Sequence, residues 1–331
     1  MNFFVKNNSL LISKKTHLSP AGGNSANYSS QANWNGTTTG NITTVGSNGG
    51  PSSYNTFDQS GNVYGWNDLN GLPGSSRGLR GGFWGNSEFV LSSSFRVTYN
   101  PSFERSYIGF RLASSSSALN PLNLSNFVVV GDANNVADTT SYGSVSTNYL
   151  IGKYSVTNCE YAAFLNAVDP AGTNPQGIYN ANMNSNVIGG ISLISGNANG
   201  SKYVTKTNMA NKPVVFVSWF DAVRYCNWLH NGRLTYPTTS AAANARNTGA
   251  YNVGTATTGN AVSKQSNAAY HIPTENEWYK AAYYKGGDTD AGYWLYATQS
   301  NTAPTAVTAS STGDGLISGV AANVSSYECP T

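Results

Sequence analysis

The chain of 331 residues carries little charge. Asp, Glu, Lys and Arg make up only 10% of it, against roughly 25% in an average soluble domain, so uncharged polar side chains must cover most of the surface. The 18 Lys and Arg residues nearly balance the 15 Asp and Glu residues, for a formal net charge of +3. This balance leaves no basic stripe that would attract nucleic acid, and we expect no nucleic-acid partner.

Long apolar runs and paired cysteines are also missing. No apolar run approaches the ~20 residues that span a bilayer, so we expect no membrane span. The N-terminal segment has no long apolar stretch followed by a small-residue cleavage site, so we assign no signal peptide and leave the compartment open. The three cysteines, Cys159, Cys226 and Cys329, are too scattered for a disulfide framework or a zinc site. Cys159 and Cys226 are predicted to be small buried hydrophobes.

Aromatic residues, by contrast, are plentiful. They make up 12% of the chain, with 7 Trp and 21 Tyr. Disordered chains have few aromatics and a high net charge, so this composition predicts a folded protein. A chain of this length can bury a sizeable core, as one large domain or two small ones.

Three helices are predicted from one device, a Ser or Thr followed three residues later by an acid. The hydroxyl accepts a hydrogen bond from a free N–H of the first turn, and the acid reaches back to the cap. Apolar residues at helical spacing follow each pair. The pairs are Thr157 with Glu160, Ser218 with Asp221, and Thr274 with Glu277. The helices are predicted to end at Asp169-Pro170, at Asn231-Gly232 and at about Tyr284.

Short strands separated by Gly, Asn and Ser turns fill much of the remaining chain. Strands are predicted near Arg77, Phe95, Tyr107, Phe127 and Tyr149, and the segment from Pro213 to Trp219 is predicted to be a short buried strand. Stretches rich in Asn, Ser, Thr and Gly at 19–50, 170–211 and 237–268 are predicted loops. Few helices with many short strands favour an α+β domain over a βαβ sheet.

Six segments occur in a specific combination. Three are ADTTSYGSVSTNYLIGKYSVTNCEYAAFLNAV, PVVFVSWFDAVRYCNWL and IPTENEWYKAAYY, which begin at Ala137, Pro213 and Ile272. The others are YNTFDQSGNVYGWND, RGLRGGFW and YIGFRLA, which begin at Tyr54, Arg77 and Tyr107. Together they resemble the formylglycine-generating-enzyme, or sulfatase-modifying-factor, family. The resemblance implies a C-type-lectin-like α+β fold with few helices, short antiparallel strands and long loops. It also implies a bacterial-type protein whose relatives are often exported.

The order of these segments is reversed relative to the family. There the GFR strand comes last, whereas here it ends near Ala113, and the segment resembling the family's opening starts near Phe127. We expect a circular permutation within one domain: 1–113 resembles the family's C-terminal half, 114–126 is a linker, and 127–331 resembles the N-terminal half. In the family's fold the first and last strands are neighbours, and close termini tolerate permutation. The alternatives are domain-swapped self-association and a truncated array.

The resemblance implies a copper site that this chain does not complete. Active relatives hold copper through two cysteines, and the matching positions here are Asn86 and Leu91, neither of which forms a thiolate. Other relatives bind iron through three histidines. Here His17, His230 and His271 are far apart in the sequence, in an irregular segment, at a helix end and before a helix, and are not predicted to bind metal. We therefore expect no copper or iron, and favour a pseudoenzyme over an enzyme.

A structural calcium ion is the one metal that the resemblance leaves open. In the family a loop holds calcium through carbonyl and carboxylate oxygens, which suit a hard cation. The matching ligands here are Asp58 and the carbonyls of Gly61 and Val63, but Gly65 replaces the family's Glu. The alternative is a turn held by Asp58 alone.

The family's active-site face corresponds here to Phe83–Tyr107. It keeps a set of aromatic, amide and charged residues that suits an adaptable contact surface: Trp84, Asn86, Glu88, Phe89, Arg96 and Tyr99. Arg80, Arg96 and Arg111 are predicted to pair with Asp68, Glu88 or Glu104. The first hypothesis is a non-catalytic domain that binds a protein, peptide or glycan through this face. The alternatives are an oxidoreductase of the formylglycine-generating or non-haem metal type, and a structural repeat module of a larger surface protein.

Overall fold

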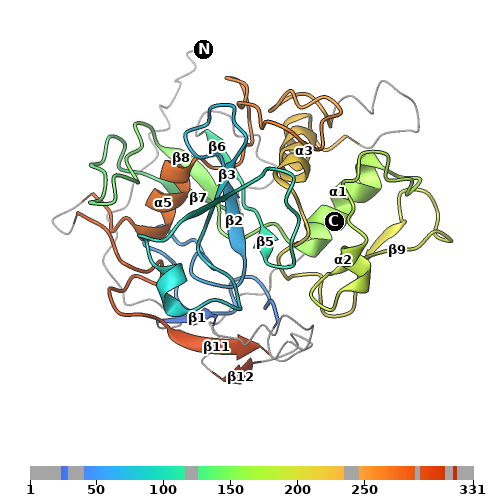
Figure 1. Cartoon of the computed structure of the whole chain (residues 1–331). Coiled ribbons are helices and arrows are strands. Elements are labelled where there is room, and N and C mark those ends of the chain that lie inside the picture. Colours follow the sequence, from blue (N-terminus) through green and yellow to red (C-terminus); the bar gives the residue numbers. More distant parts are fainter. Residues whose placement is uncertain are drawn as a thin grey trace, which may run out of the picture.

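A computed structural model describes residues 24–28, 41–115, 126–234, 246–287, 291–309 and 316–318 (Figure 1). Short helices and several small sheets alternate along the chain, and the sheets form no barrel. This confirms the predicted α+β class. In the described part of the chain no helix is long and apolar enough to cross a membrane.

The three predicted helices form where their caps place them. They are α1 (Asn158–Val168), α3 (Trp219–His230) and α5 (Glu275–Tyr283). In each one the cap hydroxyl accepts from the third backbone N–H of the helix, and the acid at that position bonds back to the cap. A short helix, α2 (Asn182–Ser185), and a 3₁₀ turn, η1 (Glu88–Leu91), were not predicted.

A central four-stranded sheet has the order β4-β3-β2-β5. Its strands are β2 (Tyr64–Asn67), β3 (Arg77–Arg80), β4 (Val97–Tyr99) and β5 (Ile108–Gly109). β3 is antiparallel to β2 and β4, whereas β5 runs parallel to β2. β2, β3 and β5 are buried throughout, whereas β4 forms a partly exposed edge.

A second sheet joins the two ends of the predicted linker, and one of its strands includes Ser114 and Ser115, which were predicted to belong to that linker. It has the order β6-β8-β7, formed by β6 (Ala113–Ser115), β8 (Tyr149–Gly152) and β7 (Phe127–Val130). Both pairings are antiparallel. The strand after the GFR motif therefore pairs with β8, and β7 lies on the other side of β8.

Two smaller sheets complete the described strands. β9 (Ile191–Leu193) and β10 (Tyr203–Thr205) form an antiparallel pair inside a predicted loop. β1 (Ser25–Asn27) runs parallel to β11 (Thr305–Ala309), which pairs antiparallel with β12 (Leu316–Ser318). In Figure 1, α1, α2 and β9 lie at one side of the view and α5 at the other, with β2 and β5 between them.

The predicted strand from Pro213 to Trp219 is not a strand. The segment is buried as expected, but Phe216 has a φ of 61°, which breaks an extended conformation. The backbone N–H of Val214 bonds to Val156, and that of Phe216 bonds to Arg105. Isolated backbone hydrogen bonds to two other segments therefore take the place of regular strand pairing.

Asp68 is a buried acid whose hydrogen-bond partners include Trp219 and Tyr251 of the apolar core. Its Oδ1 accepts from Arg77 Nε at 3.1 Å and from Trp219 Nε1 at 2.6 Å, and its Oδ2 accepts from Tyr251 at 2.7 Å. Burial raises the pKa of Asp68, while the Arg77 charge and the two neutral donors oppose that rise. These bonds tie the end of β2 to α3 and to the loop that contains Tyr251.

Candidate binding face

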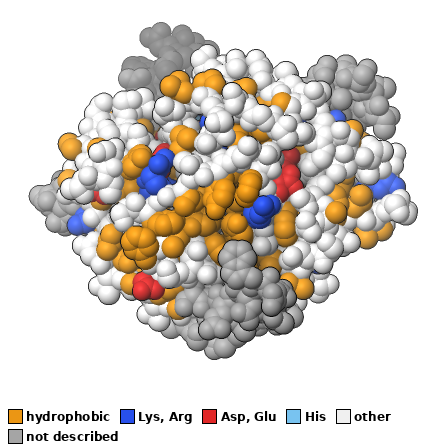
Figure 2. Space-filling view, in the orientation of Figure 1, with side chains coloured by type: hydrophobic (Ala, Val, Ile, Leu, Met, Phe, Trp, Pro, Cys, Tyr) orange, Lys and Arg blue, Asp and Glu red, His pale blue; other side chains and the backbone are white. Residues whose placement is uncertain are grey.

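The segment between β3 and β5 exposes a group of aromatic side chains, here called the aromatic face. All are half-buried except Phe89, which is 63% exposed. Figure 2 shows hydrophobic side chains gathering in a continuous band across one side of the molecule. The aromatic face consists of Phe83, Phe89, Phe95, Tyr99, Phe103 and Tyr107.

The rings of the aromatic face stack on one another in pairs. The ring centroids of Phe83 and Tyr107 lie 4.5 Å apart and those of Tyr99 and Phe103 lie 5.1 Å apart, both stacked. Phe89 meets Phe95 edge to face. Such pairs add roughly 0.5–1.5 kcal/mol beyond the area they bury, so the face is held rigid before any ligand arrives.

Four of the six predicted surface residues lie on or beside this face, namely Asn86, Glu88, Phe89 and Tyr99. Trp84, by contrast, lies beneath it. Trp84 is only 3% exposed and packs edge to face against Phe83. Its buried Nε1 has no hydrogen-bond partner among the described residues. Glu88 and Phe89 are exposed, and Tyr99 is half-buried. Trp84 can therefore support the face but cannot present its ring to a ligand.

Asn86 and Leu91, the positions predicted to match the copper cysteines, meet across Gly82. A Cβ added to Gly82 would lie 2.5 Å from Leu91 Cδ2 and 3.4 Å from Asn86 Oδ1. Gly82 also has a φ of 72°, which favours glycine. Asn86 Oδ1 accepts from the Phe83 N–H at 2.9 Å, and Leu91 is fully buried. The two positions converge, but they offer an amide and a methyl group where a thiolate pair would bind metal.

Arg96, the sixth predicted surface residue, is bound to Glu275 of α5. Its Nε and Nη2 donate to the two carboxylate oxygens at 2.8 Å each, and Arg80 Nε donates to the same carboxylate at 2.8 Å. The bonds to Glu275 raise the pKa of Arg96. The predicted pairing with Asp68, Glu88 or Glu104 is therefore wrong for both arginines, because α5 packs a buried acid against β3.

Arg111 also has different partners from those predicted. Its guanidinium donates to the carbonyl oxygens of Gly152 at 2.7 Å, Lys153 at 3.2 Å and Phe57 at 2.6 Å. Burial lowers the pKa of Arg111 to about 10, and the Asp58 charge opposes this shift. Arg111 therefore anchors backbone instead of pairing with a nearby acid.

Glu104 lies at the rim of the aromatic face, near the N-terminus of α3. Burial raises the pKa of its carboxyl to about 7, and the nearby Asp221 charge adds to that rise. Asn180 donates a hydrogen bond to Glu104, while Asp221 is held in the capping box of α3. The negative charge of Glu104 is thus reduced near neutral pH.

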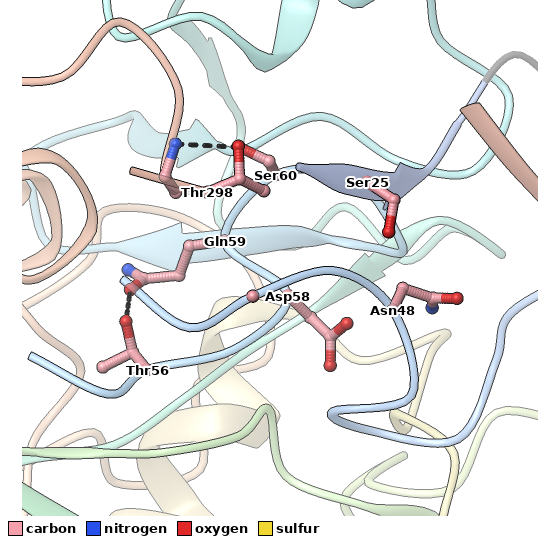
Figure 3. Close-up of a pocket in the computed structure, with 9 residues that line it drawn as sticks. Ser25, Asn48, Thr56, Asp58, Gln59, Ser60 and Thr298 are labelled. Atoms are coloured by element: carbon pink, nitrogen blue, oxygen red, sulfur yellow. Dashed lines mark hydrogen bonds between the residues drawn. The ribbon is translucent and has the colours of Figure 1, made fainter. Parts of the chain in front are cut away.

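Asp58 lines a small cavity on another part of the molecule (Figure 3). The cavity has space of about 10 Å³ for a water-sized sphere, which is close to the room that one water needs. Figure 3 shows Ser25, Asn48 and Asp58 on separate segments around the cavity, with the Asn48 amide pointing away from the Asp58 carboxylate in this view. Ser25 Oγ and Asn48 Oδ1 are buried and have no hydrogen-bond partner among the described residues.

The predicted calcium ligands are not all brought to this cavity. Asp58 lines it, whereas Gly61 and Val63 are not among its lining residues. A Cβ added to Gly65 would lie 2.9 Å from Trp278 Nε1, so an indole stands where the family's carboxylate would extend. The oxygen atoms of Asp58, Ser25 and Asn48 are nevertheless donors that suit a hard cation.

The electrostatics of the cavity favour a positive occupant. Burial raises the pKa of Asp58 to about 6, although the Gly46 N–H donates to Oδ2 at 2.6 Å and the Arg111 charge is near. None of the ion pairs within 4 Å among the described residues includes Asp58. The carboxylate is therefore only partly compensated.

The histidines and cysteines form no metal cluster in the described ranges. His230 accepts from the Ala269 N–H at 3.0 Å, and His271 lies 3.2 Å from Glu277. His17 falls outside the described residues. Cys226 is a free thiol whose pKa burial raises, as predicted for a buried hydrophobe. Cys159 is buried as predicted, but it is disulfide-bonded, which the sequence analysis did not expect.

Several residues of both sites escaped the sequence analysis. Phe103 and Arg105 were missed on the aromatic face, although a Phe or Tyr recurs at every fourth position from Phe95 to Tyr107. That recurrence was the available signal. Ser25 and Asn48 carry no local signal, because only the tertiary fold brings them to Asp58.

The short helices and small sheets define an α+β domain. The family model for the sulfatase-modifying factor enzyme 1-like domain, FGE-sulfatase, matches residues 7–116 and 128–326. The chain belongs to this family. Among curated proteins and among solved structures, none matches the chain significantly.

Proposed function

We propose that this domain is a non-catalytic member of its family that binds a protein, peptide or glycan through the aromatic face. The observation that carries the proposal is the half-buried, pre-stacked pair of rings formed by Tyr99 and Phe103, together with the exposed ring of Phe89. Rigid aromatic side chains supply contact area at low entropic cost. A group of aromatic side chains that remains partly open to solvent offers a surface that suits a partner.

The absence of copper chemistry is supported by the positions that meet across Gly82. Asn86 and Leu91 lie there in place of two cysteines. The test is incubation of the protein with copper and a peptide containing the CxPxR motif, followed by mass spectrometry. We expect no aldehyde, and formylglycine production at enzyme concentrations below the substrate would refute the proposal. A stoichiometric redox metal in the purified protein would favour an oxidoreductase instead.

Binding is tested with arrays of peptides and glycans probed with the full chain. A double variant, Phe89→Ser with Tyr99→Ser, is expected to lose the captured signals. Leu72→Ser is the matched control, because Leu72 is 61% exposed against 63% for Phe89 but lies in the turn after β2. Signals that survive the double variant would place the binding surface elsewhere. A protein that melts cooperatively only beside a second copy would favour the structural repeat module.

We also propose that the domain is a circular permutant on a C-type-lectin-like fold, with 1–113 and 127–331 joined by the 114–126 linker. Two observations support this proposal. The family match is divided into 7–116 and 128–326, so the break falls at the linker. Strand β6, which begins at the last residue of the first segment and continues into the start of the linker, pairs with β8 of the second segment within one molecule.

A structural cation, with calcium as the first candidate, is proposed for the Asp58 cavity. The support is the fully buried Asp58 carboxylate in a cavity that is also lined by Ser25 and Asn48, whose side-chain oxygens have no hydrogen-bond partner among the described residues. Calcium that binds only the folded state raises the melting temperature. We expect that rise for the wild-type protein and none for Asp58→Asn in a thermal titration. An unchanged wild-type melting curve at millimolar calcium would point to a buried water in the cavity instead.

A further inference from the structure

The open edge of β4 lies beside the aromatic face. Among the strands that the structure describes, β4 pairs only with β3, and it ends the central sheet. Its central residue, Thr98, is exposed, and its neighbours Val97 and Tyr99 are half-buried. An edge strand with solvent on its outer side presents backbone N–H and C=O groups that another extended chain can pair with.

A continuous stack leads from β4 to an exposed cation. Tyr99 of β4 stacks on Phe103 at 5.1 Å, and the guanidinium carbon of Arg105 lies 4.2 Å from the centre of the Phe103 ring. Stacking holds a guanidinium flat while its remaining N–H groups face outward. The strand edge, the aromatic rings and the positive charge are therefore parts of one surface.

Arg105 belongs to none of the ion pairs within 4 Å in the described part of the chain, although its charge acts on the nearby Glu104 carboxyl. Its Nη1 donates to the carbonyl oxygen of Glu104 at 2.8 Å, and its side chain also bonds to Tyr107. The Glu104 carboxyl is instead bonded by Asn180. Arg96, by contrast, is fully engaged with Glu275. Arg105 is thus the cation that this face offers to a ligand.

We infer that the ligand of the aromatic face is an extended acidic peptide that adds a strand to β4 and places a carboxylate on Arg105. This inference rests on the proposed function and specifies its ligand. Backbone pairing explains why the contact is an open strand edge, and alternate side chains of an added strand point toward the rings. Charge complementarity selects acidic partners over basic ones.

The first test is fluorescence anisotropy with three probes and the full-length protein. They are a short labelled peptide alternating glutamate with valine, the same peptide with lysine in place of glutamate, and an anionic glycan of equal charge. We expect the glutamate peptide to bind about tenfold or more tightly than the lysine peptide, and to weaken as salt increases. Tight binding of the lysine peptide would overturn the inference.

A pair of charge-reversal variants isolates Arg105. Arg105→Glu is expected to weaken binding of the glutamate peptide by about tenfold or more. Arg233→Glu makes the same charge change at another arginine that lies over an aromatic ring, Trp228. Arg233 follows the C-terminal end of α3. The N-terminal end of α3 is the end near the aromatic face, because the backbone N–H of Trp219 bonds to the carbonyl oxygen of Pro101, which lies between Tyr99 and Phe103 in the chain. A helix of that length, 12 residues, spans about 18 Å, so Arg233→Glu should leave binding unchanged.

Strand addition has its own readout. N-methylation of the glutamate peptide at alternate positions removes the donors on one edge only. We expect one methylated set to lose binding and the other to keep it, whereas equal effects would overturn strand addition. If only the glycan binds, and the Phe89→Ser, Tyr99→Ser variant abolishes it, the proposed function holds and this inference fails. If nothing that binds depends on that variant, both fail.

Discussion

Arg96 donates two hydrogen bonds of 2.8 Å to the carboxylate of Glu275, which lies 179 residues later in the chain. The same carboxylate accepts from Arg80, whose guanidinium is buried and lies over the rings of Tyr142 and Tyr279. One acid of α5 thus fixes two arginines of the segment that carries the aromatic face. The rigidity of the face depends on a residue far away in sequence.

Removal of Glu275 is expected to cost much more stability than removal of Arg96. Glu275→Gln leaves Arg80 as a buried, unpaired charge, and breaking such a pair costs roughly 3–5 kcal/mol. The Arg96 side chain is 35% exposed, so Arg96→Gln should cost at most about 1 kcal/mol. Urea denaturation of both variants measures the difference. Equal losses would mean that the two arginines share the carboxylate differently from the arrangement seen here.

Asp58 gives a pH dependence whose sign is fixed by burial. Its pKa rises from 3.8 to about 6 in the folded protein, so the folded state holds the proton more tightly. Protonated Asp58 therefore stabilises the folded state fully below the unfolded pKa. This contribution to the free energy of unfolding, at most about 3 kcal/mol, is lost as the pH rises through about 6. Asp58→Asn should therefore gain stability relative to wild type between pH 4 and pH 7 with a chelator present. If the free energies of unfolding of the two proteins change by the same amount over that pH range, the raised pKa is not that of Asp58.

Two cysteines placed at the positions beside Gly82 should create a soft metal site. Asn86 and Leu91 both approach Gly82, so Asn86→Cys with Leu91→Cys brings two sulfur atoms to one place. We expect the double variant to bind Cu(I) in a competition titration, because thiolates suit that ion. Each single variant is the control and should bind far more weakly. A double variant that behaves like the singles would show that these two positions do not converge as the family's cysteines do.

The two segments around the linker are expected to remain together after cleavage. A protease site inserted within 116–125 leaves β6 paired with β8 and Arg96 bonded to Glu275. The cut protein should elute as one complex with the mass of a single chain and separate only in denaturant. An uncut chain that elutes as a dimer, and yields exchanged halves, would support domain-swapped self-association instead.

The sequence predicted local structure well where a few neighbouring residues decide it. The capping boxes at Thr157, Ser218 and Thr274 marked the starts of α1, α3 and α5, because each cap is made within four residues. The segment after Pro213 was mistaken for a strand, because burial and β-branched residues resemble one. The left-handed conformation of Phe216 comes from contacts with other segments.

The amino-acid sequence by itself determined the family, the α+β class, the helix starts and the lack of a thiolate pair, since all of these depend on residue identity and short-range spacing. The tertiary structure alone decided which acid each arginine contacts, that Trp84 is covered, and that Ser25 and Asn48 reach Asp58. Pairings over such long separations depend on how α5, β1 and the central sheet pack. Burial then sets their electrostatics, and no local pattern encodes it.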